Sequence, residues 1–221
     1  LCSDLDLSND SFPFMSVQEG TVAGIAARLF RISFTGELTY EINVNANYGR
    51  HVWEAVMEAG REFEITPFGT EAMHVLRAEK GYIIVGQDTD GSVTPIDLGM
   101  DRLVAKNKDF LGKRSLSRSY IAQPDRKQFV GLLTEDPQTV LPEGGQIVDD
   151  PRAPLPRPML GHVTSSYYSA NLDRSIALGL VRGGHRRKGE TVYVQDFDGG
   201  TIAARISDSV FYDRDGSRQN V

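Results

Sequence analysis

Cysteine is almost absent from this sequence, in which Cys2 is the only one among 221 residues. An intrachain disulfide is therefore excluded, as is a zinc site built from cysteines, and a reducing, cytoplasmic location is expected. The chain also lacks any apolar run near the ~18 residues that a membrane-spanning helix needs. Its first residues, LCSDLDLSND, are acidic and unlike a secretory signal. We therefore expect no association with a membrane.

Basic charge is also in short supply. The 24 lysines and arginines are outnumbered by 30 aspartates and glutamates, which gives a net charge of −6. No basic surface dominates, so nucleic acid is not an expected partner. The one basic cluster, 185–188 (HRRK), is short and flanked by glycines, and we interpret it as a solvated turn. The remaining composition is that of a globular protein with one large domain or two small ones.

Strong catalytic motifs are absent as well. The sequence contains no GxGxxG, no Walker loop, no HExxH and no GxSxG. The four histidines lack the spacing of metal ligands, so no metal site is expected. His162 lies near Ser165 and Ser166, but no acid is placed to complete a nucleophile cluster, and this disfavours a hydrolase.

The first half of the chain mixes strand and helix patterns. Residues 20–34 are rich in apolar and β-branched side chains and predict one or two strands before a turn at Thr35-Gly36. Apolar residues recur at helical spacing in 47–60 and 70–80, and a glycine ends each helix. Residues 86–95 are dense in turn formers and predict a loop.

From Gln128 onward the pattern changes to short strands separated by turns rich in proline, glycine and aspartate. Their spacing is typical of an antiparallel barrel or sandwich. The predicted strands are FVGLLT, GQIVD, LGHVTSS, SIALGLV, TVYVQD and TIAARIS. We therefore predict an α+β chain with a mixed region, 1–122, and an all-β region, 127–221.

One predicted strand carries a carboxylate that could contact a ligand. In residues 39–44 (TYEINV) polar and apolar side chains alternate, which places Glu41 opposite the apolar face. Phe34 and Tyr40 flank the same turn, and Tyr82 follows the second helix. Aromatic rings offer flat faces for stacking, and a carboxylate can accept two parallel hydrogen bonds from an amino-imine edge such as that of a pterin.

The same pattern leaves a simpler interpretation open. Phe34 and Tyr82 would then be ordinary core residues, and Glu41 would be exposed or paired with Arg31. The pattern of residues alone favours this simpler interpretation over a ligand site.

Four blocks of the sequence resemble the aminomethyltransferase family, the T-protein of the glycine cleavage system. RISFTGELTYEINV is similar to the family's RxGYTGExGFEI, and GTEAMHVLRAEKGYIIVGQDTDGSVTPIDLGM to its ARDxLRLEAGxxLYGxDxDxxxTPxEAGL. KDFLGKRSL resembles DFIGREAL, and GHVTSSYYSANLDRSIALGLV resembles GxVTSGxxSPTLxxxIALAYV. The blocks occur in the family's order over most of the chain. The resemblance implies a partial aminomethyltransferase-like folate-binding domain followed by an antiparallel C-terminal β-barrel.

Four stretches resemble one branch of this family more closely: SFTGELTYEINV, PFGTEAMHVLRAEKGYIIVGQDTDG, DFLGKRSL and the ending SVFYDRDGSRQNV. They look like the C-terminal part of the large alpha subunits of heterotetrameric sarcosine oxidases. Those oxidoreductases couple oxidative demethylation of sarcosine to transfer of the one-carbon unit onto tetrahydrofolate, giving 5,10-methylenetetrahydrofolate. The resemblance implies tetrahydrofolate as the ligand here and beta, gamma and delta subunits as partners, with FAD, FMN and NAD bound only elsewhere in the parent complex. It also implies that the chain, which begins at Leu1, is a C-terminal fragment that is inactive alone.

The resemblance also implies a set of folate-binding residues. Glu41 matches the glutamate that grips the pterin ring, and Phe34 matches the tyrosine of GYTG that lies against the folate. Tyr82 corresponds to the residue after EAG, near the ligand, and Tyr40 beside Glu41 completes the set. The family's catalytic aspartate lies upstream of Leu1, so we expect no catalytic residue in this chain.

Two departures from the family pattern leave other functions open. Met73 stands where T-proteins have the arginine of ARD, and Phe34 lacks the tyrosine hydroxyl. One alternative is the folate domain of a dimethylglycine dehydrogenase or a free-standing aminomethyltransferase. Another is a structural domain that holds oxidase subunits together around a lapsed folate pocket. Because a fragment would expose apolar surface, self-association is also expected.

Overall fold

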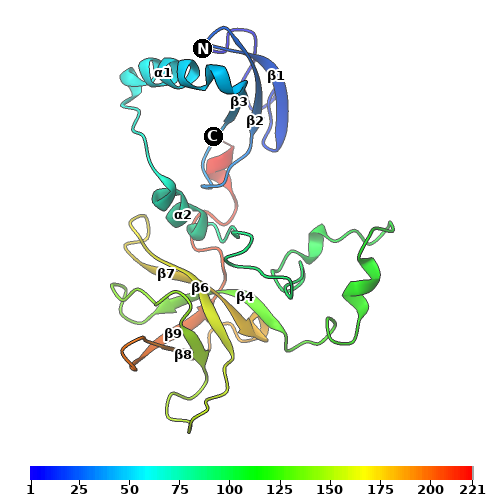
Figure 1. Ribbon diagram of the computed structural model, residues 1–221, viewed down its shortest axis with the longest axis vertical. Coiled ribbons are helices and arrows are strands. Elements are labelled where there is room, and N and C mark those ends of the chain that lie inside the picture. The colour runs from blue at the N-terminus through cyan, green and yellow to red at the C-terminus, as the bar shows by residue number, and fades with distance from the viewer. Residues whose placement is uncertain (221) are drawn as a thin grey trace. The chain divides into compact units, whose positions relative to one another are not determined.

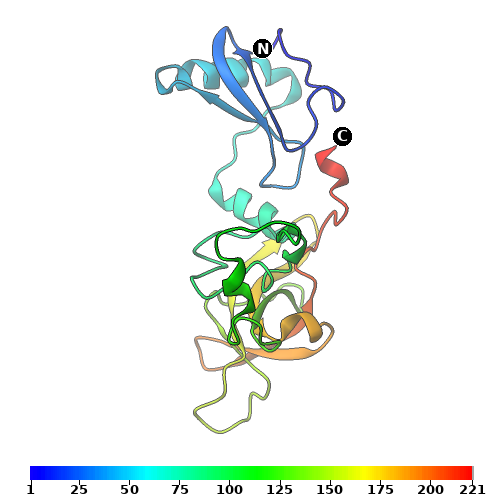
Figure 2. The ribbon, with the colours of Figure 1, turned by 90° about the vertical axis from the view of Figure 1, so that its right-hand side faces the viewer.

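The computed structural model describes residues 1–220, which form two compact units (Figures 1 and 2). The first unit contains residues 1–76 together with the C-terminal residues from Asp213, so both ends of the chain belong to it. The second unit runs from Arg77 to Tyr212. The predicted α+β class is confirmed, whereas the division into 1–122 and 127–221 stays a prediction.

The first unit is built on a three-stranded antiparallel sheet in the order β1-β2-β3. Its strands are β1 (Ser16–Val22), β2 (Ile25–Arg31) and β3 (Glu41–Val44). The loop between β1 and β2 has two residues, Ala23 and Gly24, with φ of +51° and +78°. Positive φ at both positions is what a tight hairpin requires, because this backbone twist matches that of the flanking strands.

Helix α1 (Gly49–Ala59) packs on one face of this sheet (Figure 1). The helix buries Val52 against side chains from the sheet and from the N-terminal segment, namely Phe12, Val22, Ala27 and Leu29. Short 3-10 turns flank the helix at Ala46–Tyr48 and Arg61–Phe63, and another, Ser217–Gln219, lies in the C-terminal segment. The opposite face of the sheet is left without a covering helix within this unit.

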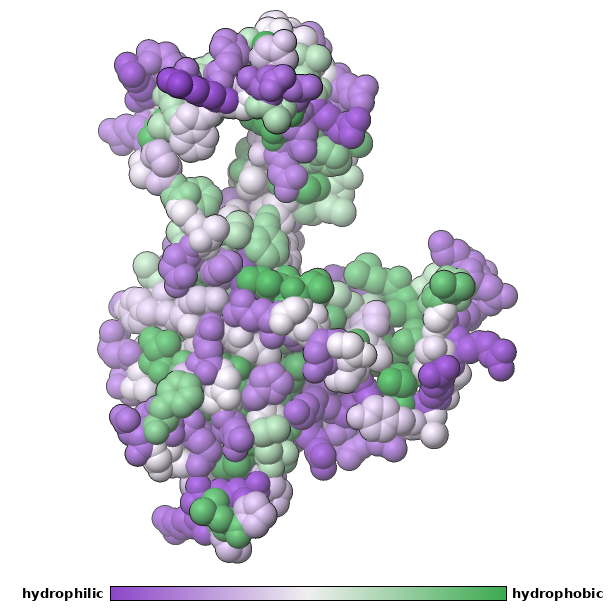
Figure 3. Space-filling view, viewed as in Figure 1, coloured by the Kyte–Doolittle hydropathy of each residue, from purple (hydrophilic) through white to green (hydrophobic). Residues whose placement is uncertain are grey.

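Helix α2 (Thr70–Glu79) ends one residue earlier than the sequence predicts, and the loop predicted at 86–95 is confirmed. Residues 96–126 contain only short 3-10 helices, at Asp101–Leu103 and Lys113–Ser117. Hydrophobic side chains gather on the surface of this segment (Figure 3), where Leu103 and Leu111 are exposed. None of the helices described between residues 1 and 220 is long and apolar enough to cross a membrane.

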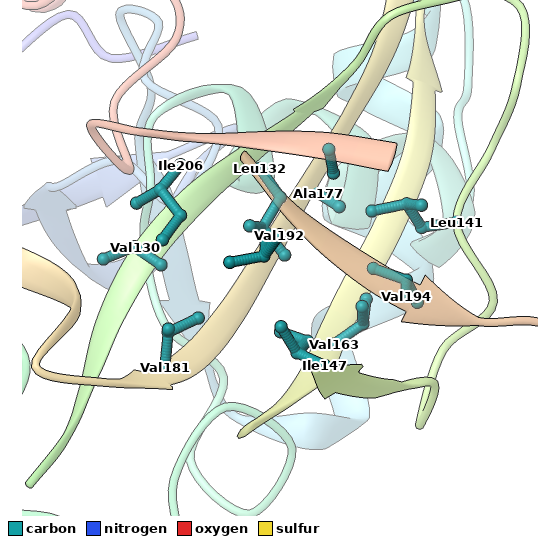
Figure 4. Packing of buried hydrophobic residues seen from close by; sticks show 11 residues of the cluster. Val130, Leu132, Leu141, Ile147, Val163, Ala177, Val181, Val192, Val194 and Ile206 are labelled. Atoms are coloured by element: carbon teal, nitrogen blue, oxygen red, sulfur yellow. The ribbon is translucent and has the colours of Figure 1, made fainter. Parts of the chain in front are cut away.

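The second unit ends in a closed antiparallel barrel, as predicted, with the strand order β4-β7-β6-β5-β8-β9. All six predicted strands are present. They are β4 (Lys127–Thr134), β5 (Gln146–Val148), β6 (Gly161–Ser169), β7 (Arg174–Arg182), β8 (Thr191–Gln195) and β9 (Thr201–Ser207). Side chains from these strands converge inside the barrel (Figure 4), where Leu132, Ile147 and Val192 are almost fully buried.

Strand β7 is buried on both faces. Its alternate residues Ala177 and Val181 point into the barrel core, whereas Ile176, Leu178 and Leu180 pack outside the barrel. A strand buried on both sides reads as a continuous apolar run, which explains the sequence SIALGLV. The outer cluster fixes the segment after α2 on the barrel wall, because it includes Ala78 and partly buried side chains from residues 83–98.

The interpretation of residues 185–188 as a solvated turn is wrong in part. Gly184–Arg186 does form a 3-10 turn. However, His185 is half-buried with its Nε2 3.1 Å from the carbonyl oxygen of Phe129, and Arg187 forms ion pairs with Asp149 and Glu190. His185 and Arg187 thereby attach the turn to the barrel, because Phe129 and Asp149 are distant from it in sequence.

Candidate functional site

The four sequence-predicted folate residues do not all fall in one unit. Glu41, Phe34 and Tyr40 belong to the first unit, and Tyr82 belongs to the second. The structure brings the first three together on the loop that connects β2 to β3 and on the start of β3.

Glu41 is the first residue of β3 and lies opposite Phe30 of β2. Phe30 in turn lies opposite Val17 of β1, so the three side chains form a row on the face of the sheet away from α1. Glu41 is exposed, and no described residue hydrogen-bonds to its carboxylate. The alternation read from the sequence therefore places Glu41 correctly, on an open face.

The alternative pairing of Glu41 with Arg31 is wrong. Arg31 lies on the other face of the sheet and is 1% exposed. Its guanidinium donates to the carbonyl oxygens of Phe12, at 2.7 Å, and Gln219, at 3.3 Å. Arg31 thus ties the C-terminal segment to the sheet, which leaves the carboxylate of Glu41 without an arginine partner in the described chain.

The loop before Glu41 is held by a local hydrogen bond and by an ion pair with the C-terminal segment. Gly36 has a φ of +86°, a conformation that glycine adopts without strain, and its N–H donates to the Ser33 hydroxyl at 2.9 Å. Glu37 accepts from Arg218 of the C-terminal segment, with Nε–O distances of 2.8 and 2.7 Å. Phe34 is 37% exposed on this loop, so it is not the ordinary core residue of the simpler interpretation.

Tyr40 is used within the first unit. Its ring centroid lies 5.9 Å from that of Phe12, and the ring packs against the hydrophobic cluster under the sheet. The hydroxyl donates to the carbonyl oxygen of Leu7 at 3.4 Å. The Tyr40 side chain therefore attaches the end of the loop to the face of the sheet that packs on α1. Glu41, the next residue, lies on the opposite face.

The backbone of Tyr82 is hydrogen-bonded to Arg77, which belongs to a buried polar network in the second unit. Its N–H donates to the carbonyl oxygen of Arg77, and its own carbonyl oxygen accepts from the Arg77 guanidinium, both at 3.0 Å. Arg77 is fully buried and pairs with Asp88 at 2.6 Å. The two hydrogen bonds between Arg77 and Tyr82 fix the backbone on both sides of Gly81, and the side chain of Tyr82 is half-buried.

Asp88 is the centre of that network, and sequence reasoning missed it. Besides Arg77 it accepts from the N–H of Ile84 at 2.8 Å and from the hydroxyls of Ser165, at 2.9 Å, and Thr164. In the sequence it is one polar residue among the turn formers of GQDTDG, and only its place in the family-like GxD block could have singled it out.

The same contacts decide against a serine nucleophile. The Ser165 hydroxyl donates to Asp88 and accepts from Arg77 at 2.6 Å, and the residue is fully buried. His162 lines a different pocket, with Asp90 and Lys127. In residues 1–220 no three His, Cys, Asp or Glu side chains are placed to hold a metal ion.

Comparisons with known proteins agree with this architecture. The family model of the GCVT N-terminal domain matches residues 1–108, and that of the glycine cleavage T-protein C-terminal barrel domain matches residues 127–213. The chain is similar to the sarcosine oxidase subunit alpha of Corynebacterium sp. (strain U-96), with 50% identity over 100% of this chain and 23% of the relative. It thus spans about a quarter of that relative's length.

Two further matches come from glycine cleavage enzymes. The aminomethyltransferase of Halothermothrix orenii is 32% identical over 84% of this chain and 50% of its own. The crystal structure of glycine cleavage system aminomethyltransferase T from Bartonella henselae superposes with a TM-score of 0.76 at 25% identity, covering 91% of this chain and 53% of that chain. The chain therefore belongs to the glycine cleavage T-protein family and is, over its whole length, a homologue of sarcosine oxidase alpha subunits.

Proposed function

We propose that this chain is the C-terminal part of a sarcosine oxidase alpha subunit and that it helps to bind tetrahydrofolate for one-carbon transfer. The relatives support the assignment, since the match to a sarcosine oxidase alpha subunit extends over the whole chain. The structural observation that carries the proposal is Glu41, an exposed carboxylate without a described partner, which follows the loop that exposes the aromatic ring of Phe34.

The residues present fit a pterin. A carboxylate accepts two parallel hydrogen bonds from the amino-imine edge of the ring, and the charge makes these bonds stronger than neutral ones. Phe34 offers an apolar face for stacking. Tyr40 contributes by holding the loop, because its partly buried ring already packs against the hydrophobic cluster. Tyr82 belongs to the second unit and is proposed on the family resemblance alone.

In this proposal the chain binds and orients the acceptor, and oxidation of the amine takes place elsewhere in a complex with beta, gamma and delta subunits. Tetrahydrofolate, when bound, supplies the nucleophilic amines that accept the one-carbon unit. The residues named here hold the pterin ring in place, so the rate of one-carbon transfer increases chiefly through proximity and orientation. Proton transfer is assigned to the aspartate that the family carries upstream of this chain.

An anaerobic titration with tetrahydrofolate, followed by calorimetry, tests the proposal. Glu41→Gln should raise Kd about tenfold or more, since it removes a charge-assisted pair of hydrogen bonds. Glu19→Gln is the matched control, because Glu19 is an exposed carboxylate on the same face of the same sheet and pairs with Arg28. Equal loss in both variants would contradict the role of Glu41.

The intact complex provides a second test. If tetrahydrofolate traps the one-carbon unit, adding it should lower the release of formaldehyde during turnover. Unchanged release would refute the transfer function. A dimethylglycine dehydrogenase or a free-standing aminomethyltransferase would be distinguished by the amine that the intact protein oxidises, or by the lack of any oxidase activity.

A structural assembly domain is the second candidate, and the surface of residues 95–116 favours it. An apolar groove there is lined by Leu103, Val104, Phe110, Leu111 and Leu116. Exposed apolar surface of this kind is typical of protein–protein contacts. If assembly is the only function, Leu111→Asp should prevent incorporation into the complex, whereas Glu41→Gln should leave every activity of the complex unchanged.

A further inference from the structure

The second unit contains a cavity of about 220 Å³ that is separate from the residues assigned to folate. Its floor is Leu180, on the outer face of the barrel, and its walls come from β4, β6, β7 and the loops 90–93 and 120–126. This volume is below the ~300 Å³ at which pockets for drug-sized ligands begin. The cavity can therefore take only a small molecule.

Arg126 fixes one wall of the cavity. Its guanidinium donates to both carboxylate oxygens of Asp97, at 2.8 to 3.1 Å, and it is 5.2 Å from the ring centroid of Tyr120. The carbonyl oxygen of Arg126 accepts from the N–H of Gly183 at 2.8 Å. The loop that carries Tyr120 is thereby attached to the end of β7, so the cavity is preformed.

Two cations in this cavity form no hydrogen bond or ion pair through their side chains with any described residue. Lys127 begins β4, and Arg182 ends β7 directly opposite it. Like charges at directly opposed strand positions repel each other and destabilise a sheet. Elsewhere in the same unit the partly buried Arg187 and the exposed Lys188 form ion pairs with carboxylates. Lys127 and Arg182 have no such ion pair, so a ligand carboxylate placed between these two cations would relieve their repulsion.

The cavity also holds carboxylates that are not fully used. Asp90 accepts from the N–H and hydroxyl of Ser92 through one oxygen only, at 2.7 and 2.6 Å, and Asp125 has no partner within residues 1–220. Lys127, Asp90 and His162 lie within electrostatic reach of each other. Burial, and then the charge of Lys127, lower the pKa of His162 below 6.5, so the imidazole is neutral at pH 7.

We propose that this cavity binds a small amino acid as its zwitterion, with the carboxylate between Lys127 and Arg182 and the ammonium group on Asp90 and Asp125. The two charges of a zwitterion complement the charged side chains that line the cavity. Two cations without an ion pair and two carboxylates with unused oxygens line one small space, so a simple anion would meet Asp90 and Asp125, and a simple cation would meet Lys127 and Arg182. Only a ligand with both charges satisfies all four groups.

The test is a titration of the chain with glycine, followed by NMR through the ring protons of His162. Glycine should shift these signals in a saturable way, and acetate and methylammonium should each bind at least tenfold more weakly. Lys127→Gln should weaken glycine binding about tenfold or more, since it removes a charge-assisted hydrogen bond. Lys106→Gln, an exposed lysine outside the cavity, should have no effect.

Three results would overturn the proposal: no shift with glycine up to the ~100 mM range, acetate binding as tightly as glycine, or equal effects of Lys127→Gln and Lys106→Gln. If Lys127→Gln does not fold, Arg182→Gln replaces it, because Arg182 is exposed at the end of β7. The inference is independent of the folate proposal. Glu41→Gln should bind glycine as the unaltered chain does.

Discussion

Replacing Asp88 by asparagine should lower the free energy of unfolding of the barrel unit by about 3–5 kcal/mol. Asp88 and Arg77 both have side chains that are 0% exposed, with 2.6 Å between them. Removing one charge of such a pair leaves the other buried and uncompensated. The Nε of Arg77 has no hydrogen-bond partner, and the remaining partners of the guanidinium, which include the Tyr82 carbonyl oxygen and the Ser165 hydroxyl, are neutral, so Asp88 is the one carboxylate among the described residues that forms an ion pair with this charge.

Urea unfolding followed by circular dichroism measures this loss, since the barrel strands lie in the second unit. The only tryptophan, Trp53, is on α1, so its fluorescence follows the first unit separately. Asp109→Asn is the matched control. Asp109 pairs with Lys113 at 3.0 Å but is 99% exposed, and exposed ion pairs contribute little, so the unfolding free energy should not change measurably.

A double substitution separates the cost of an unpaired charge from the value of the pair. Arg77→Met with Asp88→Leu should cost less than the sum of the two single changes, because no buried charge remains. A loss below about 1 kcal/mol for Asp88→Asn, or strict additivity in the double variant, would refute the reasoning.

Three further predictions concern the second unit. The pKa of Asp97 lies below its usual 3.8. Burial, the largest influence, raises this pKa, but the hydrogen bonds from Arg126 and Thr94 together lower it by more. The stabilisation that Asp97 gives the fold is therefore present above pH 3.8 and is lost as the pH falls through the folded-state pKa. Asp97→Asn should reduce this loss of stability at acid pH, measured as the free energy of unfolding at a series of pH values. Lys127→Gln should raise the pKa of His162, which burial first and Lys127 second hold below 6.5, and a lower value in an NMR titration would contradict this. Gly161→Ala should destabilise the barrel by about 3 kcal/mol or more, because its Cβ would lie 1.8 Å from the carbonyl oxygen of Leu180. Gly91→Ala, which meets nothing within 4 Å, should leave the melting temperature unchanged.

Features encoded by short-range periodicity could be predicted from the sequence. Helix α2 was expected at 70–80 and runs from Thr70 to Glu79, because helical spacing and a stopping glycine are local signals. The six barrel strands are also local, since each is an apolar run between turn residues. The side of the sheet on which Glu41 lies follows from two-residue alternation alone.

The candidate site could be predicted only in part. Family-like blocks led to Glu41 and Phe34, and the structure leaves both exposed. The same reasoning could not tell that Tyr40 packs against the hydrophobic cluster of the first unit or that Arg31 is buried. Both outcomes depend on contacts with the N-terminal segment and, for Arg31, with the C-terminal segment as well, and no local pattern encodes them.

The sequence by itself therefore determined the element types, the strand faces and the family of this protein. Only the tertiary structure decided which polar residues meet. Arg77 of α2 reaches Ser165 because the segment after α2 packs on the barrel wall, and Lys127 faces Arg182 because β4 pairs with β7 in the barrel. Pairings between strands that are not neighbours in sequence depend on the free energy of the whole core, which periodicity within one segment does not contain.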